Sequence, residues 1–293
     1  MSQAQLWKGA FLLTLSCLLF ALMGVLIRQI SPDVNTQTIV FSRNFIGLIL
    51  LLPFILKKGK SAIQTHCYHL HLLRAGVGVA AMYCFFYAIA TLPLADAMLF
   101  TYAAPVFTPL IAYFWLKEAI RAKTYLSVAL GFIGVCLALK PSSGVIDSHA
   151  FVGLSASILA ATAFVSVRRL TKSESTQKIV FFFCLNASII SAFPLLWTWQ
   201  ALSLLQCGYL VAIAMLATSS QLLLSRAYAL APAGQIGPIS YSAILYAGLL
   251  AWLLWGEVPD TYSILGTTLV VISGLITLNF KPGTAKTSKS AAI

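Results

Sequence analysis

Ten long apolar segments make up most of this 293-residue chain and limit what it can fold into. A run of about 20 apolar residues spans the hydrocarbon core of a bilayer as one helix. Only 9% of the residues are charged, whereas a soluble domain has roughly 25%. The sequence therefore predicts an all-α integral membrane protein with ten transmembrane helices, over residues 9–27, 36–56, 72–92, 95–116, 125–139, 151–167, 179–198, 209–230, 234–255 and 263–280.

The basic residues gather in alternate loops between these segments. Lys57 and Lys58 are grouped with Arg74, which lies at the start of the third segment, and Arg168 and Arg169 follow the sixth. Cytoplasmic loops of membrane proteins carry this excess of Lys and Arg, so we expect a bacterial inner-membrane protein with both termini in the cytoplasm. The net charge of +12 does not indicate a nucleic-acid partner, because the charges are spread over loops and form no single basic face.

The cysteines and histidines do not predict a metal or cofactor site. None of the six cysteines forms a CxxC pair, so we interpret them as small buried hydrophobic residues. His66, His69 and His71 fall in one predicted loop with no carboxylate beside them.

The chain repeats itself at a shift of 139 residues. The rarer residue types match when 88–118 is compared with 227–257, as in Pro93 with Pro232, Tyr102 with Tyr241 and Glu118 with Glu257. A repeat of five helices is odd, so the second copy enters the membrane in the opposite orientation. Inverted repeats are an architecture of secondary transporters, which bind substrate near the midplane between the repeats.

We therefore predict three regions. Residues 1–141 form the first five-helix repeat, residues 142–282 form the second, and residues 283–293 are a disordered cytoplasmic tail. Alternating access between the two repeats moves a small polar metabolite across the lipid bilayer. Both a monomer and a homodimer remain open.

Several stretches resemble the EamA family of the drug/metabolite transporter superfamily, and together they cover nearly the whole chain. They are FSRNF (41–45), HLLRAGVG (71–78) and residues 90–118, 131–141 and 229–257. The resemblance implies the ten-helix plan and transport of amino acids, nucleotide-like metabolites, vitamins or exported waste products. Members that take up S-adenosylmethionine look broadly similar in the first half, so uptake of S-adenosylmethionine or of a vitamin is an alternative.

Arg43 is the most informative single residue. It stands about seven positions into the second predicted helix, roughly 10 Å deep, with Asn44 beside it. A charge at that depth is costly and marks a functional site by default. We expect Arg43 to face a central cavity and attract a carboxylate or phosphate of the substrate. The alternative is that it extends to the membrane surface or binds backbone carbonyls.

Tyr102 and Tyr241 are the pair related by the repeat, and each lies near the predicted midplane. Prolines follow or precede them at Pro105, Pro109 and Pro238. Proline frees a backbone carbonyl, which membranes tolerate where a helix lines a cavity. We therefore expect the fourth and ninth helices to wall the cavity, or the prolines to kink these helices for packing alone.

Further substrate-binding candidates are polar residues within the apolar segments. Tyr83 and Tyr87 are four residues apart and share a helix face. Polar side chains in a helix core also bond to neighbouring helices, so a packing role is the alternative for each. The remaining candidates are Asn186, Gln221 and Tyr246.

The sequence also lacks several motifs. It has no P-loop, nucleophile elbow or HExxH, so we predict neither direct ATP drive nor an enzyme. No carboxylate or histidine falls mid-segment, which favours a facilitator or exchanger over a proton-coupled carrier. An intramembrane enzyme and a non-transporting scaffold are the alternatives from other classes.

Overall fold

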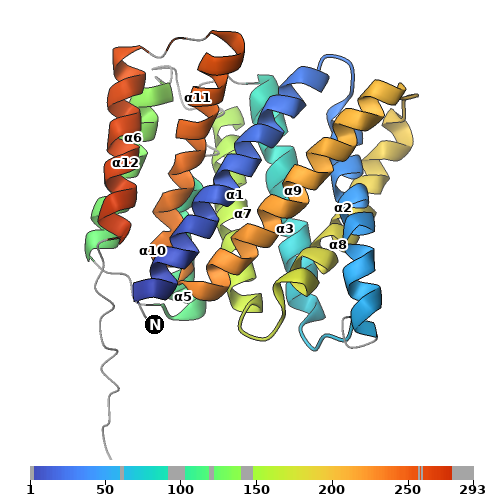
Figure 1. Ribbon diagram of the computed structural model, residues 1–293, viewed down its shortest axis with the longest axis horizontal. Helices are drawn as coiled ribbons and strands as arrows, with labels where there is room; N and C mark the ends of the chain where they lie inside the picture. The colour runs from blue at the N-terminus through green and yellow to red at the C-terminus, as the bar shows by residue number, and fades with distance from the viewer. Residues whose placement is uncertain are drawn as a thin grey trace, which may run out of the picture.

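The computed structural model describes residues 3–59, 63–91, 103–118, 122–139, 148–256, 258 and 260–278. Within these ranges the chain is helical, with short connections and no β-strand (Figure 1). The prediction of an all-helical membrane protein is confirmed at this level. Six stretches are long and apolar enough to cross a membrane, namely Gln3–Ile30, Thr36–Lys57, Phe151–Leu170, Thr176–Thr198, Leu204–Leu230 and Ala233–Trp255.

Each predicted apolar segment contains a described helix. The helices are α1 Gln3–Ile30, α2 Thr36–Lys58, α3 Tyr68–Thr91, α5 Ala104–Leu116, α6 Ala122–Leu139, α7 Ser148–Leu170, α8 Thr176–Thr198, α9 Leu204–Leu230, α10 Ala233–Ile236, the 3₁₀ helix η2 Gly237–Tyr241, α11 Ser242–Trp255 and α12 Thr261–Leu278. The beginning of the fourth predicted segment, the junction at 141 and 142, Glu257 and the tail 283–293 lie outside the described residues.

The outer surface of the bundle is apolar, and its interior holds buried polar side chains among the hydrophobic ones. Leu196, Trp197 and Leu204 are exposed by 70% or more, whereas Arg43 and Asn44 are buried. In lipid an exposed leucine costs nothing, and a polar side chain needs shelter from the hydrocarbon. The burial pattern is therefore that of a protein dissolved in a bilayer.

Two turns at opposite ends of the bundle have the same backbone hydrogen bonds. After α1, Val34 N donates to Ile30 O; after α7, Glu174 N donates to Leu170 O. The matching residues are 140 positions apart in both pairs. Figure 1 shows the α1–α2 turn at the upper end and the α7–α8 turn at the lower end. The first turn of α1 and the last turn of α12 both lie at the lower end.

Helix packing follows the same correspondence. α1 packs most extensively on α9 as α3 does on α7, while α2 packs on α8 and α6 on α12. Serines join two of these crossings: Ser16 and Ser220 each donate to the other's carbonyl, at 2.8 and 3.0 Å, and Ser127 and Ser273 do so at 2.7 Å. Small polar residues of this kind let membrane helices approach closely.

The stretch from Ala233 to Trp255 is not a continuous α-helix. A 3₁₀ turn, η2, separates α10 from α11, with Pro238 in its first turn. Proline has no N–H to donate, so the regular ladder is interrupted there. The predicted irregularity of the ninth helix is present, and η2 packs against α5, α6, α12 and α1.

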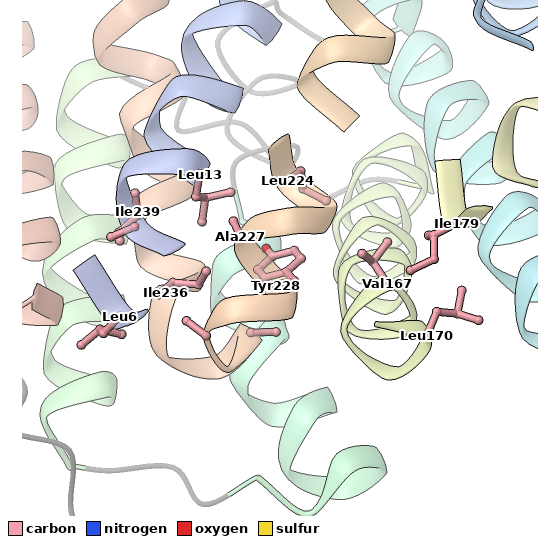
Figure 2. Packing of buried hydrophobic residues seen from close by; sticks show 13 residues of the cluster. Leu6, Leu13, Val167, Leu170, Ile179, Leu224, Ala227, Tyr228, Ile236 and Ile239 are labelled. Atoms are coloured by element: carbon pink, nitrogen blue, oxygen red, sulfur yellow. The ribbon is translucent and has the colours of Figure 1, made fainter. Parts of the chain in front are cut away.

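A hydrophobic core lies toward the lower end of the bundle. Figure 2 shows Leu13 from α1, Leu224 and Tyr228 from α9 and Val167 from α7 converging in this region. The cluster joins helices from both halves of the chain, so these helices are held together near the end where the α7–α8 turn lies.

One prediction about the start of α3 was wrong. His69 and His71, expected in a loop, and Arg74, grouped with the loop cations, all belong to α3, which begins at Tyr68. His71 has no exposed surface, and its ring lies 4.5 Å from that of Phe182. The sequence reasoning took these residues to be solvated, but neighbouring helices bury His71 and Arg74, while His69 is exposed.

Candidate substrate site

Arg43 on α2 is buried inside the bundle. Asn35 caps α2, its Oδ1 accepting from Thr38 N at 2.8 Å, and Arg43 follows about two turns later. Arg43 is 7% exposed and Asn44 1%. Among the described residues no hydrogen bond to the Arg43 guanidinium is found, and Asn44 Nδ2 is buried without a partner. This burial opposes the interpretation in which Arg43 extends to the membrane surface.

Arg74 on α3 is a second buried arginine, 4% exposed. Its Nη2 donates to Gln221 Oε1 on α9 at 2.9 Å, and its guanidinium carbon lies 4.2 Å from the centre of the Phe183 ring on α8. Its Nε has no hydrogen-bond partner among the described residues. Arg74 therefore connects three helices and keeps a donor unused.

The two arginines flank adjacent residues of α8. Arg74 packs on the ring of Phe183, and the backbone of α2 one turn after Arg43 approaches Cys184. One turn after Arg43, a Cβ on Gly47 would lie 3.2 Å from Cys184 Sγ and 2.7 Å from Thr218 Oγ1. The backbone of α2 thus comes close to α8 and α9 beside Arg43.

Glycine also makes room for the second guanidinium. A Cβ on Gly78 would lie 2.5 Å from Arg74 Nη1 and 3.1 Å from Phe183 Cε2. Any side chain at this position would push the arginine away from its place between Phe183 and Gln221.

No carboxylate neutralises this pair within the described part of the chain. Glu118 pairs with Arg168 at 2.9 Å and Glu174 with Lys178 at 2.8 Å, both near the lower end. Asp33 and Asp260 are exposed beyond the helices. Two buried cations with unused donors and no acid beside them form a site suited to an anion.

The other candidates on α3 and α8 lie in different environments. Asn186 is 3% exposed and accepts a hydrogen bond from the Tyr68 hydroxyl at 2.8 Å. The Tyr83 hydroxyl is buried without a described partner, whereas Tyr87 is 45% exposed. The two tyrosines that share a helix face in the sequence therefore differ in environment.

The tyrosines of the ninth segment lie elsewhere. Tyr241 is fully buried among Val135, Ile244 and Val270, and a Cβ on Gly131 would collide with its ring. The hydroxyl of Tyr241 has no partner among the described residues. Tyr246 is partly buried on α11. No contact links either of them to the arginines in the described residues, and Tyr102 lies outside those residues.

Sequence reasoning missed Arg74, Phe183 and Cys184. For Arg74 a signal existed in HLLRAGVG, where Gly76 and Gly78 leave space on the same helix. Phe183 and Cys184 carry no such signal, because an apolar residue in an apolar helix gives no indication of its neighbours.

Hydrogen bonds join helices and loops at both ends of the bundle. At the lower end Arg168 Nη1 donates to Tyr228 O at 2.6 Å, Lys178 donates to Gln64 O at 2.7 Å, and Thr65 donates to Glu174. At the upper end Asn35 Nδ2 donates to Thr198 O at 2.7 Å and to Gln200 Oε1 at 2.9 Å.

Glu174 lies in the α7–α8 turn. Burial raises the pKa of its carboxyl, but hydrogen bonds from Lys178 and Thr65 outweigh burial and leave the pKa below its usual value. The carboxylate is therefore ionised at neutral pH and holds this turn against the α2–α3 loop.

The chain matches a known family over most of its length. A model of the EamA-like transporter family matches residues 7–140 and 148–279. A pseudopaline exporter of Pseudomonas aeruginosa is 31% identical over 279 residues, covering 94% of this chain and 98% of the relative. An S-adenosylmethionine uptake transporter of Rickettsia bellii is 22% identical over 84% of this chain and 85% of the relative.

A solved crystal structure has the same fold. It superimposes with a TM-score of 0.80 at 17% sequence identity, covering 92% of this chain and 96% of that one. The family and the names of the relatives confirm a membrane transporter and not an enzyme. The chain therefore belongs to the EamA-like transporter family, as its resemblance to the drug/metabolite transporters predicted.

Proposed function

We propose that this protein is a secondary transporter that carries a small polar metabolite with an anionic group across the inner membrane by alternating access. The observation that carries the proposal is the buried pair Arg43 and Arg74, which no carboxylate of the described residues neutralises. A purely structural arginine in a membrane is normally paired, and a charge without a protein partner indicates a substrate pathway.

The proposed architecture is ten helices in two inverted five-helix repeats. Three observations support it: the matching turns at opposite ends of the bundle, the corresponding helix contacts, and the interrupted helix at η2. Arg43 and Arg74 come from the first half and Gln221 and Cys184 from the second. The site would thus lie between the repeats, where rocking of one half against the other exposes it to each side in turn.

The proposed orientation places the lower end of Figure 1 in the cytoplasm. Lys57 at the end of α2 and Arg168 and Arg169 at the end of α7 lie there, together with the start of α1. This distribution favours cytoplasmic termini by the positive-inside rule.

The relatives include one named an exporter and others named uptake transporters. Uptake of S-adenosylmethionine is the second candidate function, favoured by the Rickettsia relatives. For uptake or for export, we expect a facilitator or exchanger and not a proton-coupled carrier. No acid of the described residues lies beside the arginines to carry a proton.

The test begins with cells that have or lack the gene. Metabolites that change inside and outside the cells are identified, and their flux is then measured in proteoliposomes with Arg43→Gln as the site variant. Arg226→Gln is the matched control, because Arg226 is an exposed arginine on α9.

We expect the wild type and Arg226→Gln to transport the metabolite and Arg43→Gln to lose flux at a normal protein level. Intact flux in Arg43→Gln removes Arg43 from the site. If no metabolite, S-adenosylmethionine included, moves through the wild-type protein, the transporter proposal fails and a scaffold role takes its place.

A further inference from the structure

The site offers more positive charge than one carboxylate neutralises. Two guanidiniums from different helices, both more than nine-tenths buried, flank adjacent residues of α8: Arg74 packs on Phe183, and Arg43 stands one turn before Gly47, which approaches Cys184. Both guanidinium groups stay protonated, because arginine does not lose its proton inside a protein. A ligand with one negative charge would leave a buried net charge of plus one, and a ligand with two would leave none.

The available donors also fit two anionic groups. Arg74 Nε is buried and unpartnered while Arg74 Nη2 is held by Gln221, so the free edge of this guanidinium is oriented by the protein. Arg43 approaches from α2 and has no described hydrogen-bond partner, with the unpartnered Asn44 Nδ2 next to it in sequence. A planar guanidinium binds an oxyanion through paired N–H donors, and two guanidiniums provide two such sets.

Gln221 keeps the net charge of the site positive. It satisfies one donor of Arg74 through a neutral amide oxygen at 2.9 Å, in a position where a glutamate would form an ion pair of the same shape. Because an amide leaves the arginine charge uncompensated, the counter-charge must come from the ligand.

We propose that Arg43 and Arg74 together bind a dianionic substrate, whose shared chemistry is either two carboxylates or one phosphate monoester. This inference rests on the proposed function and names its substrate class. Loading a dianion makes the occupied site electrically neutral, and the occupied carrier can then change conformation without moving an uncompensated charge through the hydrocarbon. The empty carrier keeps both charges, which favours exchange of one substrate for another.

The test uses the full-length protein in lipid nanodiscs and two matched pairs of probes, with binding measured by isothermal titration calorimetry. Succinate is compared with its monoamide succinamate, and methyl phosphate with dimethyl phosphate, at about pH 8, where the phosphate monoester is a dianion. We expect the dianion of at least one pair to bind at least about tenfold more tightly than its monoanionic partner. The pair with the larger ratio identifies the carboxylate or the phosphate chemistry.

Charge variants assign the preference to this site. Gln221→Glu adds a carboxylate to Arg74 without changing its shape, and we expect the dianion-to-monoanion ratio to fall to about threefold or less. Gln206→Glu, at the start of the same helix, is the control and should leave the ratio unchanged, because a glutamate also serves the capping box there. A second variant, Arg74→Gln, should lower the ratio in the same way, and Arg74→Lys should restore part of it.

Three outcomes overturn the proposal. They are equal binding within both pairs, no binding of any of the four probes, and a ratio that Gln221→Glu leaves unchanged. Flux with equal binding in each pair would refute the dianion class and keep the transporter. Dianion binding without flux of any metabolite would refute the transporter and keep the anion site.

Discussion

Arg74 Nη2 on α3 donates a hydrogen bond to Gln221 Oε1 on α9, which joins the first half of the chain to the second at 2.9 Å. The guanidinium also packs on the Phe183 ring, with its carbon 4.2 Å from the ring centre. These two contacts fix the orientation of the buried Arg74 guanidinium. They therefore also fix the direction in which its unpartnered Nε points. This link connects the fold of the protein to its proposed chemistry.

Gly78→Ala should reduce transport without reducing stability. The new methyl group would lie 2.5 Å from Arg74 Nη1 and displace the guanidinium, while alanine in place of glycine favours the helix by about 1 kcal/mol. Flux in proteoliposomes should fall at least about tenfold. Gly76→Ala is the control, because a Cβ there meets nothing within 4 Å. Equal flux in the two variants would show that the position of Arg74 does not matter.

Cysteine labelling should place the two matching turns on opposite sides of the membrane. In a cysteine-free protein, Pro32→Cys in the α1–α2 turn should react with an impermeant maleimide added to intact spheroplasts. Ser173→Cys in the α7–α8 turn should react only after permeabilisation. Both positions are exposed, so accessibility within the protein does not limit either reaction. Labelling of both from the same side would refute the inverted repeat.

Gly134→Val should destabilise the contact between α6 and α12. A Cβ at Gly134 would lie 2.6 Å from Gly266 O, a backbone atom that cannot move aside without shifting a helix. Overpacking of this kind costs about 1–3 kcal/mol, which should lower the thermal unfolding midpoint in detergent. Gly274→Val on α12 is the matched control, since no atom lies within 4 Å of its added Cβ. Equal midpoints would show that the close crossing is absent.

Glu118→Gln should loosen the lower end of the bundle. Arg168 holds α7 to Glu118 after α5 and to the Tyr228 carbonyl at the end of α9, and the amide replaces a charge-assisted bond with a weaker one. In a variant that keeps only Cys184, alkylation of this buried thiol from the lower side should become faster. Asp33→Asn at the upper end is the control. An unchanged alkylation rate would show that the pair does not control access.

Glu174 should make stability depend on pH in acid. Its folded-state pKa lies below the usual value near 4.5, so its contribution is complete above that value and is lost as pH falls through the folded-state pKa. Glu174→Gln should therefore have a lower thermal unfolding midpoint than the wild type at neutral pH. In acid the midpoints of the two proteins should become more similar. Asp33→Asn is the control, because that side chain is exposed. A constant difference across this pH range would contradict the assignment.

Length and hydropathy alone were enough to predict the helices. Because the bilayer has one thickness and every backbone group in it must be paired, a run such as 179–198 has no stable alternative to the helix Thr176–Thr198. The same reasoning identified Arg43 as exceptional, since burying a charge is the most costly feature that a sequence can show. The repeat in the sequence is matched by the turns at Ser31–Asn35 and Thr171–Ser175, and its inverted arrangement remains a prediction.

Only the tertiary structure decided which polar residues meet. From the sequence Tyr241 and Arg43 were both candidates, yet Tyr241 is packed against Gly131, whereas α2 approaches Cys184 one turn after Arg43, beside the Phe183 ring that holds Arg74. Hydropathy describes how well each single residue tolerates lipid. It therefore does not predict which residues contact one another. The contact between Arg74 and Gln221 depends on how α3 and α9 are rotated and packed, and that follows from interactions between residues 147 positions apart in the chain.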